Sequence, residues 1–292
     1  MTHPRVVLAP IDFSDPSRTA LDVAARLARH TGAALHVLHA EDPLMAEAAR
    51  QGGIDLRADT EEELGRFIAS TPSAAALAPA KHVAIGPPVD VILSAARTLG
   101  ADLIVVGSHG MSGAERLVFG STTEGILRNA GVSVLVTPSA WAAAGAGGDL
   151  TGAGPLIAAV DFSPASLAAA RSACALAAAL GTTTELVHVV PELPVLARWS
   201  AHAAAAVREG VETARAELAR VTADLHCAVS VDAKVETGGV ADRLAAAAAP
   251  SRDRQPILVL GRRGAGERRG VPGSTAYRVL TLAKVPVLMH IE

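Results

Sequence analysis

The chain has very few aromatic residues and no excess of basic charge. Only 2% of its 292 residues are aromatic, the formal net charge is −3 at pH 7, and the sequence pI is about 6.4. Few rings leave few surfaces on which nucleobases can stack. A slightly acidic chain also lacks the positive field that attracts nucleic acid or anionic lipid. We therefore expect no nucleic-acid partner and no membrane partner.

Long apolar runs, a secretory leader and metal-type cysteine spacing are also missing. No apolar run approaches the ~20 residues that cross a bilayer, and the first residues lack a signal-peptide pattern. The two cysteines, Cys174 and Cys227, lie in different expected elements and have no metal-binding spacing. The expectation is a cytoplasmic protein with two inert, free thiols.

Signatures of common enzymes are absent as well. The sequence contains no Gly-x4-Gly-Lys-Ser/Thr loop, no His-Glu-x2-His pair and no Gly-x-Ser-x-Gly turn. No obvious lysine or water-positioning carboxylate lies in its glycine-rich loops, and phosphoryl transfer depends on such groups. We expect ligand binding, with slow hydrolysis at most.

The most informative feature that is present is a glycine-rich segment after an apolar stretch at residues 103–106. Its residues are Gly107, Ser108, His109 and Gly110, then nine others, then Gly120, Ser121 and Thr122. Glycine allows the backbone to approach a phosphate closely. The start of a helix adds unpaired N–H groups and partial positive charge. The segment predicts an anion cradle with a nucleotide as its ligand.

The second half of the chain repeats the first in altered form. Residues of the first half recur at a constant offset of 149, so that Asp12, Phe13, Ser14, Gly32 and His39 correspond to Asp161, Phe162, Ser163, Gly181 and His188. The glycine segment recurs with eight loop residues instead of nine and with Arg262 and Arg263 replacing Ser108 and His109. We interpret the chain as two copies of one domain, residues 1–140 and 155–292, joined by a glycine-rich linker at 141–154.

Within one copy, expected strands alternate with expected helices. The first copy has strands near 6–10, 35–40, 82–85, 103–106 and 132–137, and helices near 14–31, within 41–70, at 89–99 and from 120 to before 131. Alternation of this kind favours a parallel sheet covered on both faces. Asp12 follows the first strand and Gly107 follows the fourth. If these strands are neighbours, both residues line one crevice at the carboxyl end of the sheet.

These residues resemble the universal stress protein family in its tandem form. The family pattern Gly-x2-Gly-x9-Gly-Ser/Thr is matched by Gly107, Gly110, Gly120 and Ser121, and the first strand ends in the expected aspartate, Asp12. The resemblance covers nearly the whole chain, twice. It implies an α/β fold of two tandem, doubly wound, Rossmann-like domains, each with a five-stranded parallel sheet in the order 3-2-1-4-5.

The resemblance also implies ATP binding, as in one branch of the family. Asp12 and the backbone at Ala40 would then hold adenine, and Gly107, His109 and Gly110 would lie near ribose and phosphate. Gly120, Ser121 and Thr122 would take the distal phosphates, with Mg²⁺ arriving on the nucleotide. The corresponding residues of the second copy are Asp161, Val189, Gly261, Gly264, Gly273, Ser274 and Thr275.

Several alternatives stay open on the sequence alone. Asp12 and Asp161 could merely cap the first helix of each copy, and Ser121 and Ser274 could be ordinary N-caps. His39 and His188 are expected to be structural rather than catalytic.

The leading function is a cytoplasmic ATP-binding sensor of stress or dormancy. The alternatives are a nucleotide-independent interaction module and a slow ATPase. The family resemblance further implies that the fifth strands of the two copies pair within one chain, and a homodimer is a further expectation.

Overall fold

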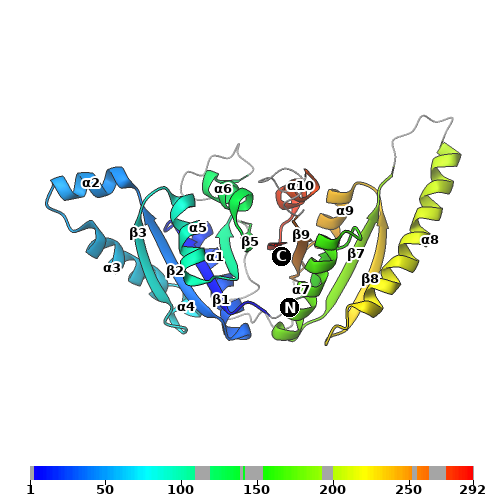
Figure 1. Ribbon diagram of the computed structural model, residues 1–292, viewed down its shortest axis with the longest axis horizontal. Coiled ribbons are helices and arrows are strands. Elements are labelled where there is room, and N and C mark those ends of the chain that lie inside the picture. Colours follow the sequence, from blue (N-terminus) through cyan, green and yellow to red (C-terminus); the bar gives the residue numbers. More distant parts are fainter. Residues whose placement is uncertain are drawn as a thin grey trace. The chain divides into compact units, whose positions relative to one another are not determined.

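Strands and helices alternate along the chain, as the sequence predicts. The computed structural model describes residues 3–108, 119–138, 141, 154–192, 200–251, 255–262 and 274–291. The chain divides into two units, Pro4–Ala142 and Ala143–Glu292. Each unit is described by itself below, and Figure 1 labels its elements.

The first unit contains five strands and six helices among its described residues. In chain order they are β1 (Val6–Ile11), α1 (Asp15–Thr31), β2 (Ala34–Glu41), α2 (Pro43–Gln51), α3 (Leu56–Ala69), α4 (Pro72–Ala75), β3 (Ala80–Ile85), α5 (Pro88–Leu99), β4 (Leu103–Gly107), α6 (Ser121–Asn129) and β5 (Ser133–Thr137).

The second unit repeats the five strands with fewer described helices. Its elements are β6 (Leu156–Ala159), α7 (Pro164–Leu180), β7 (Thr184–Val190), α8 (Ser200–Asp224), β8 (Val231–Thr237), α9 (Val240–Ala247), β9 (Ile257–Gly261), α10 (Ser274–Leu282) and β10 (Val287–His290). Within the described residues, no helix is both long enough and apolar enough to cross a membrane.

Each unit has a parallel sheet with the predicted strand order. The order is β3-β2-β1-β4-β5 in the first unit and β8-β7-β6-β9-β10 in the second, which is 3-2-1-4-5 in both. β1 pairs in parallel with β2, with Val6 opposite Ala34, and with β4, with Val7 opposite Leu103. The first and fourth strands are therefore neighbours, as a crevice between Asp12 and Gly107 requires.

Helices cover both faces of each sheet (Figure 1). In the first unit α1 packs on β1 and β4 while α5 and α6 pack together on the opposite face. All five residues of β4 are buried, as expected for a strand covered on both sides. The buried stripe of α1 includes Leu21, Ala24, Leu27 and Ala28, which recur at helical spacing in the sequence.

The first helix of each unit begins and ends where the sequence predicts. The Ser14 side chain accepts a hydrogen bond from the Ser17 amide at 3.3 Å and caps α1. Ser163 caps α7 in the same way, with Pro164 as the first helical residue. Gly32 and Gly181 end these helices in the left-handed conformation, with φ of 69° and 63°.

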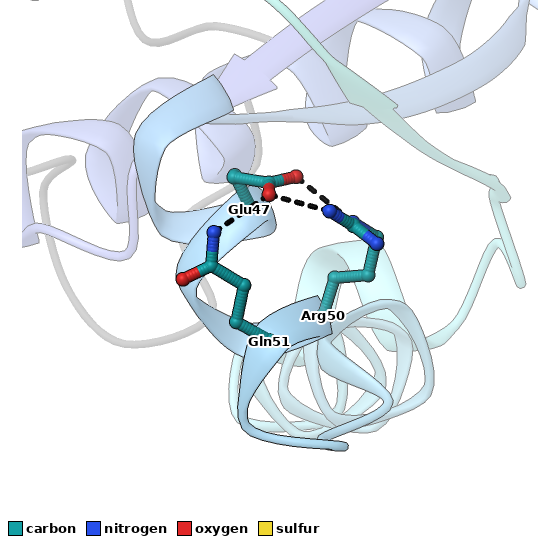
Figure 2. A network of polar contacts seen from close by, with 3 residues as sticks. All are labelled: Glu47, Arg50 and Gln51. Carbon is teal, nitrogen blue, oxygen red and sulfur yellow. Dashed lines mark hydrogen bonds and ion pairs between the residues drawn. The ribbon is translucent and has the colours of Figure 1, made fainter.

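The prediction of one helix between β2 and β3 is wrong, because this segment forms α2, α3 and α4. Gly52 ends α2, and Gly53 has a φ of 69°, which is incompatible with a right-handed helix that continues through this residue. No residue of α2 is buried, and its polar side chains interact with one another. Figure 2 shows the Glu47 carboxylate accepting hydrogen bonds from Arg50, at 2.9 and 2.5 Å, and from Gln51 at 2.8 Å. Arg50 and then Gln51 therefore lower the pKa of Glu47, and this network lies in solvent.

The expectation of two free thiols is also wrong. Cys174 of α7 and Cys227, which lies between α8 and β8, form a disulfide with a Cα–Cα distance of 5.5 Å. Their separation of 53 residues hides this pairing in the sequence. The fold brings them together because α7 packs on β6 and β9 while α8 packs on β7 and β8, which are strands of the same sheet.

Candidate nucleotide site

A cavity of about 270 Å³ opens at the carboxyl ends of the first unit's central strands. It collects every predicted first-copy site residue that the structure describes, namely Asp12, Ala40, Gly107, Gly120, Ser121 and Thr122. His109 and Gly110 lie outside the described residues. The volume is close to the lower end of the range of about 300–1,000 Å³ that is usual for ligand pockets.

Strand order explains why residues so far apart in sequence meet here. β1 lies between β2 and β4. The chain therefore continues from β1 to β2 on one side of this point in the sheet, and from β4 to β5 on the other side. Such a switch point leaves a crevice beyond the carboxyl ends of the strands. Pairing of β1 with β2 stops at Ile11 opposite His39, so Ala40 extends one residue past it at the cavity wall.

Asp12 has a structural role in addition to its place in the cavity. Its Oδ1 accepts hydrogen bonds from the Ser14 amide at 3.1 Å and from the Ser14 hydroxyl at 2.5 Å. The turn holds Phe13 at a φ of 64°, which is unusual for a residue with a Cβ atom. Asp12 therefore does not cap α1 itself, because Ser14 is the N-cap; Asp12 holds that serine in place, a role that is compatible with a ligand contact.

Gly107 also has a packing reason to be glycine. A Cβ atom at this position would lie 3.0 Å from the backbone carbon and oxygen of Pro16, in the first turn of α1. The end of β4 can approach α1 this closely only without a side chain. Its carbonyl oxygen accepts a hydrogen bond from the buried Thr123 hydroxyl at 2.7 Å, which fixes the start of α6 against β4.

The N-terminus of α6 faces the cavity without a side-chain cap. Gly120 is the N-cap residue and provides no side-chain cap, no other described residue is recorded as capping the helix, and Ser121, Thr122 and Thr123 all line the cavity. The interpretation of Ser121 as an ordinary N-cap is therefore wrong, since it is the first helical residue. Amides at this end of a helix have no intrahelical acceptor and attract anions. These amides give the α6 side of the cavity a partial positive charge.

His39 lines the cavity but is held by the fold. Its Nδ1 lies 3.0 Å from the Ile11 carbonyl oxygen, and because a carbonyl can only accept, Nδ1 carries the proton. The Phe13 ring lies against it, with ring centroids 4.5 Å apart. These contacts support the structural interpretation of this histidine.

Several cavity residues were not identified from the sequence. Ser17 and Thr123 are hydroxyl residues next to predicted ones, and Pro88 and Ile92 come from the start of α5. Two signals were available: the spacing of Ser17 from the Ser14 cap, and the place of Thr123 as the third hydroxyl residue of the run that begins at Ser121. Nothing local indicates that α5 forms a wall of the cavity.

The second unit has a cavity of about 290 Å³ at the equivalent place. The predicted residues Asp161, Val189, Gly261 and Thr275 line it. Gly264 and Gly273 lie outside the described residues, and the structure gives only the backbone of Ser274, at the start of α10. His188 repeats the position of His39, with Nδ1 2.7 Å from the Val160 carbonyl oxygen.

Asp161 lines the second cavity, whereas Arg262 is not among its lining residues, and the two charged groups have different surroundings. Burial acts to raise the pKa of Asp161, but hydrogen bonds from Ser163 and Ser166 outweigh it and keep the pKa below its usual value. Arg262 follows β9, and burial lowers the pKa of its guanidinium. Its backbone N–H donates to the His290 carbonyl oxygen at 3.0 Å.

The fold and the cavities define a class of protein: tandem α/β units, each with a ligand-sized cavity at the switch point of a 3-2-1-4-5 sheet. The profile of the Universal stress protein family matches residues 4–138 and again residues 154–290. The chain belongs to the universal stress protein family, in tandem form.

Individual relatives agree with this assignment. The chain is 30% identical to the universal stress protein YxiE of Bacillus subtilis over an alignment of 142 residues, which covers 44% of this chain and 96% of that protein. It is 32% identical to the universal stress protein A homolog 2 of Coxiella burnetii over an alignment of 127 residues, which covers 41% of this chain and 86% of that protein. Among solved structures, a universal stress protein from Archaeoglobus fulgidus is similar with a TM-score of 0.62 at 21% identity, covering 98% of both chains. At that identity the likeness concerns the fold.

Proposed function

We propose that this universal stress protein binds ATP in the cavity of its first unit and acts as a cytoplasmic sensor of stress or dormancy. Asp12 and the backbone at Ala40 would contact adenine, and the amides and hydroxyls at Gly120, Ser121 and Thr122 would contact phosphates. The observation that carries the proposal is the uncapped N-terminus of α6, which opens into the same cavity as Asp12.

The contrast between α1 and α6 strengthens this proposal. Both helices begin at the carboxyl end of the sheet, and α1 has a serine cap and an aspartate that supports it. α6 has a glycine in the N-cap position and therefore leaves its first amides for another acceptor. A polyphosphate supplies such acceptors, and each hydrogen bond to a charged group contributes about 1.5–3 kcal/mol.

Magnesium would be held mainly by the nucleotide. Among the described residues, no three His, Cys, Asp or Glu side chains gather into a metal cluster. Mg²⁺ usually retains waters and binds substrate phosphates rather than an all-protein cage. The hydroxyls of Ser121 and Thr122 are the protein oxygens that could complete its coordination.

The second cavity is proposed as a further nucleotide site with different phosphate contacts. Asp161 repeats the carboxylate, and the arginine at position 262 comes where the first unit has Ser108. A guanidinium suits phosphate recognition. We propose two nucleotides per chain, with the two sites differing in affinity.

Replacement of Ser121 by proline tests the α6 amide directly. Proline is favoured at the first position of a helix, and the preceding residue, Gly120, already has the φ of −63° and ψ of 148° that proline requires of its neighbour. Ser121→Pro should therefore keep the fold and remove one phosphate-facing N–H. We expect ATP affinity to fall about tenfold or more, which corresponds to ~1.5–3 kcal/mol.

The matched control is Ser121→Ala, which removes the hydroxyl and keeps the amide. Equilibrium dialysis with labelled ATP, at constant Mg²⁺, gives both affinities, and circular dichroism confirms the fold. Equal affinity for the proline and alanine variants would show that this amide does not bind the nucleotide. No binding by the parent protein at millimolar ATP would refute the function and favour a nucleotide-independent interaction module.

Assembly and location are further parts of the proposal. β5 and β10 each lie at one end of their unit's strand order. We propose that these strands pair the units, with a homodimer as a second form of assembly. Light scattering of the purified protein gives its mass, and cell fractionation tests the cytoplasmic location.

A further inference from the structure

Two histidines face each other on neighbouring strands of the first unit, apart from the residues that line the cavity. His36 lies on β2 opposite Ala80, and His82 lies on β3 opposite Leu38. The two are thus diagonal neighbours on one face of the sheet. Side chains in this relation are within reach of each other when they are long or aromatic.

The ring nitrogens of this pair are close. His36 Nδ1 lies 2.9 Å from His82 Nε2, and the rings are stacked with centroids 5.1 Å apart. In the neutral pair one nitrogen donates a proton to the other. Both nitrogens can coordinate a metal ion once that proton moves to the other nitrogen of the same ring.

The separation of the nitrogens suits particular metals. With metal–nitrogen bonds of about 2.0–2.1 Å, nitrogens this far apart subtend an angle of about 90° at a shared ion. Neighbouring ligands in tetragonal Cu²⁺ and Ni²⁺ complexes make such an angle, whereas tetrahedral Zn²⁺ needs a wider one. Both side chains are partly exposed, so an ion and its waters can reach them.

The second unit shows that the fold does not require this pair. At the equivalent diagonal position Glu185 of β7 faces Lys234 of β8, with Lys234 Nζ 3.0 Å from Glu185 Oε2. An ion pair therefore satisfies the same location in the same sheet. The histidines of the first unit are a chemical difference between two otherwise repeated units.

We propose that His36 and His82 form a binding site for a divalent transition-metal ion of the Cu²⁺ or Ni²⁺ type, with water in the remaining positions. Such an ion ties the edge strand β3 to β2. The two histidines are the protein ligands among the described residues, where no larger cluster of metal-binding side chains exists.

The second unit supplies the matched variant for the test. His36→Glu with His82→Lys copies the ion pair that the second unit already uses, so the fold should survive. His82→Gln is a milder variant that removes one ligand. All proteins are untagged and carry His3→Gln, because a histidine near the chain start can bind Cu²⁺ with the backbone.

Calorimetric titration with Cu²⁺ and Ni²⁺ measures binding, and pulsed electron paramagnetic resonance of bound Cu²⁺ detects imidazole nitrogen. We expect the His3→Gln parent to bind one ion with an imidazole signal and to unfold at a higher temperature with the ion. Both variants should lose this binding. A parent that binds no ion, or folded variants that bind like the parent, would overturn the proposal.

A gain-of-function variant provides an independent measurement. Glu185→His with Lys234→His places the same pair at the same register in the second unit. A second bound ion per chain supports the geometric explanation. A correctly folded variant that still binds a single ion contradicts it.

Discussion

The disulfide between Cys174 and Cys227 should account for much of the stability of the second unit. It closes a separation of 53 residues that contains β7 and α8. In the chain-entropy description, a loop of this length restricts the unfolded chain by about 14 cal/mol/K, or ~4 kcal/mol at 25 °C. The free energy of unfolding of a single domain is only about 5–15 kcal/mol, so losing the disulfide would remove a large part of the second unit's stability.

Reduction and substitution both test this magnitude. Dithiothreitol opens the bond, and Cys174→Ala with Cys227→Ser removes it. Alanine suits position 174, since α7 is rich in buried alanine. We expect the free energy of unfolding of the second unit, measured with guanidinium, to fall by up to about 4 kcal/mol. The reduced parent protein and the double variant should unfold alike, and dithiothreitol should not change the unfolding of the variant.

Hydrogen exchange can assign the effect to one unit. Amides of β7 and β8 should exchange faster after reduction, whereas those of β1 and β4 should be unchanged. Identical unfolding midpoints before and after reduction, with two titratable thiols appearing on reduction, would refute the stability argument. Two titratable thiols in the untreated protein would refute the disulfide itself. The same thiol count on rapidly acid-quenched cells reports whether the bond exists in its compartment, since cytosolic disulfides are rare.

Two further predictions concern the strand ends that form the cavities. Gly107→Ala should destabilise the first unit by about 1–3 kcal/mol through overpacking, because the new Cβ atom meets the Pro16 backbone at 3.0 Å. Gly261→Ala should lower the stability of the second unit by more, because the new Cβ atom would lie 2.5 Å from the Ala165 backbone oxygen. Chemical denaturation that shows a larger loss for Gly107→Ala would contradict this ranking. The pKa of Asp161 is lowered in the folded state from its usual 3.8, so its stabilisation is present above that pH and is lost as the pH falls through the lower, folded value. Unfolding midpoints between about pH 2 and 6 should therefore fall less steeply for Asp161→Asn than for the parent, and equal slopes would exclude this contribution.

Parts of the candidate site were predictable because their signals are local or repeated. The caps at Ser14 and Ser163 need only a hydroxyl before a helix. The strand order followed from the family resemblance, and once β1 and β4 are neighbours, Asp12 and Gly107 must share a crevice.

Other parts needed the three-dimensional contacts. From the sequence, Gly107 is explained by the close approach of a ligand to the backbone. The structure adds a second reason, the close approach of Pro16, which no local sequence pattern reveals. The break between α2 and α3 has a local signal, since two glycines, Gly52 and Gly53, follow each other where the first helix ends.

The repeat, the alternation of strands and helices, and the helix start at Gly120 are encoded in local sequence, because caps, turns and apolar spacing act over a few residues. The meeting of distant side chains depends instead on the three-dimensional packing. It paired Cys174 with Cys227, His36 with His82, and left the first amides of α6 without a side-chain cap. These outcomes depend on strand register and helix packing, which bring together atoms that no short stretch of sequence relates.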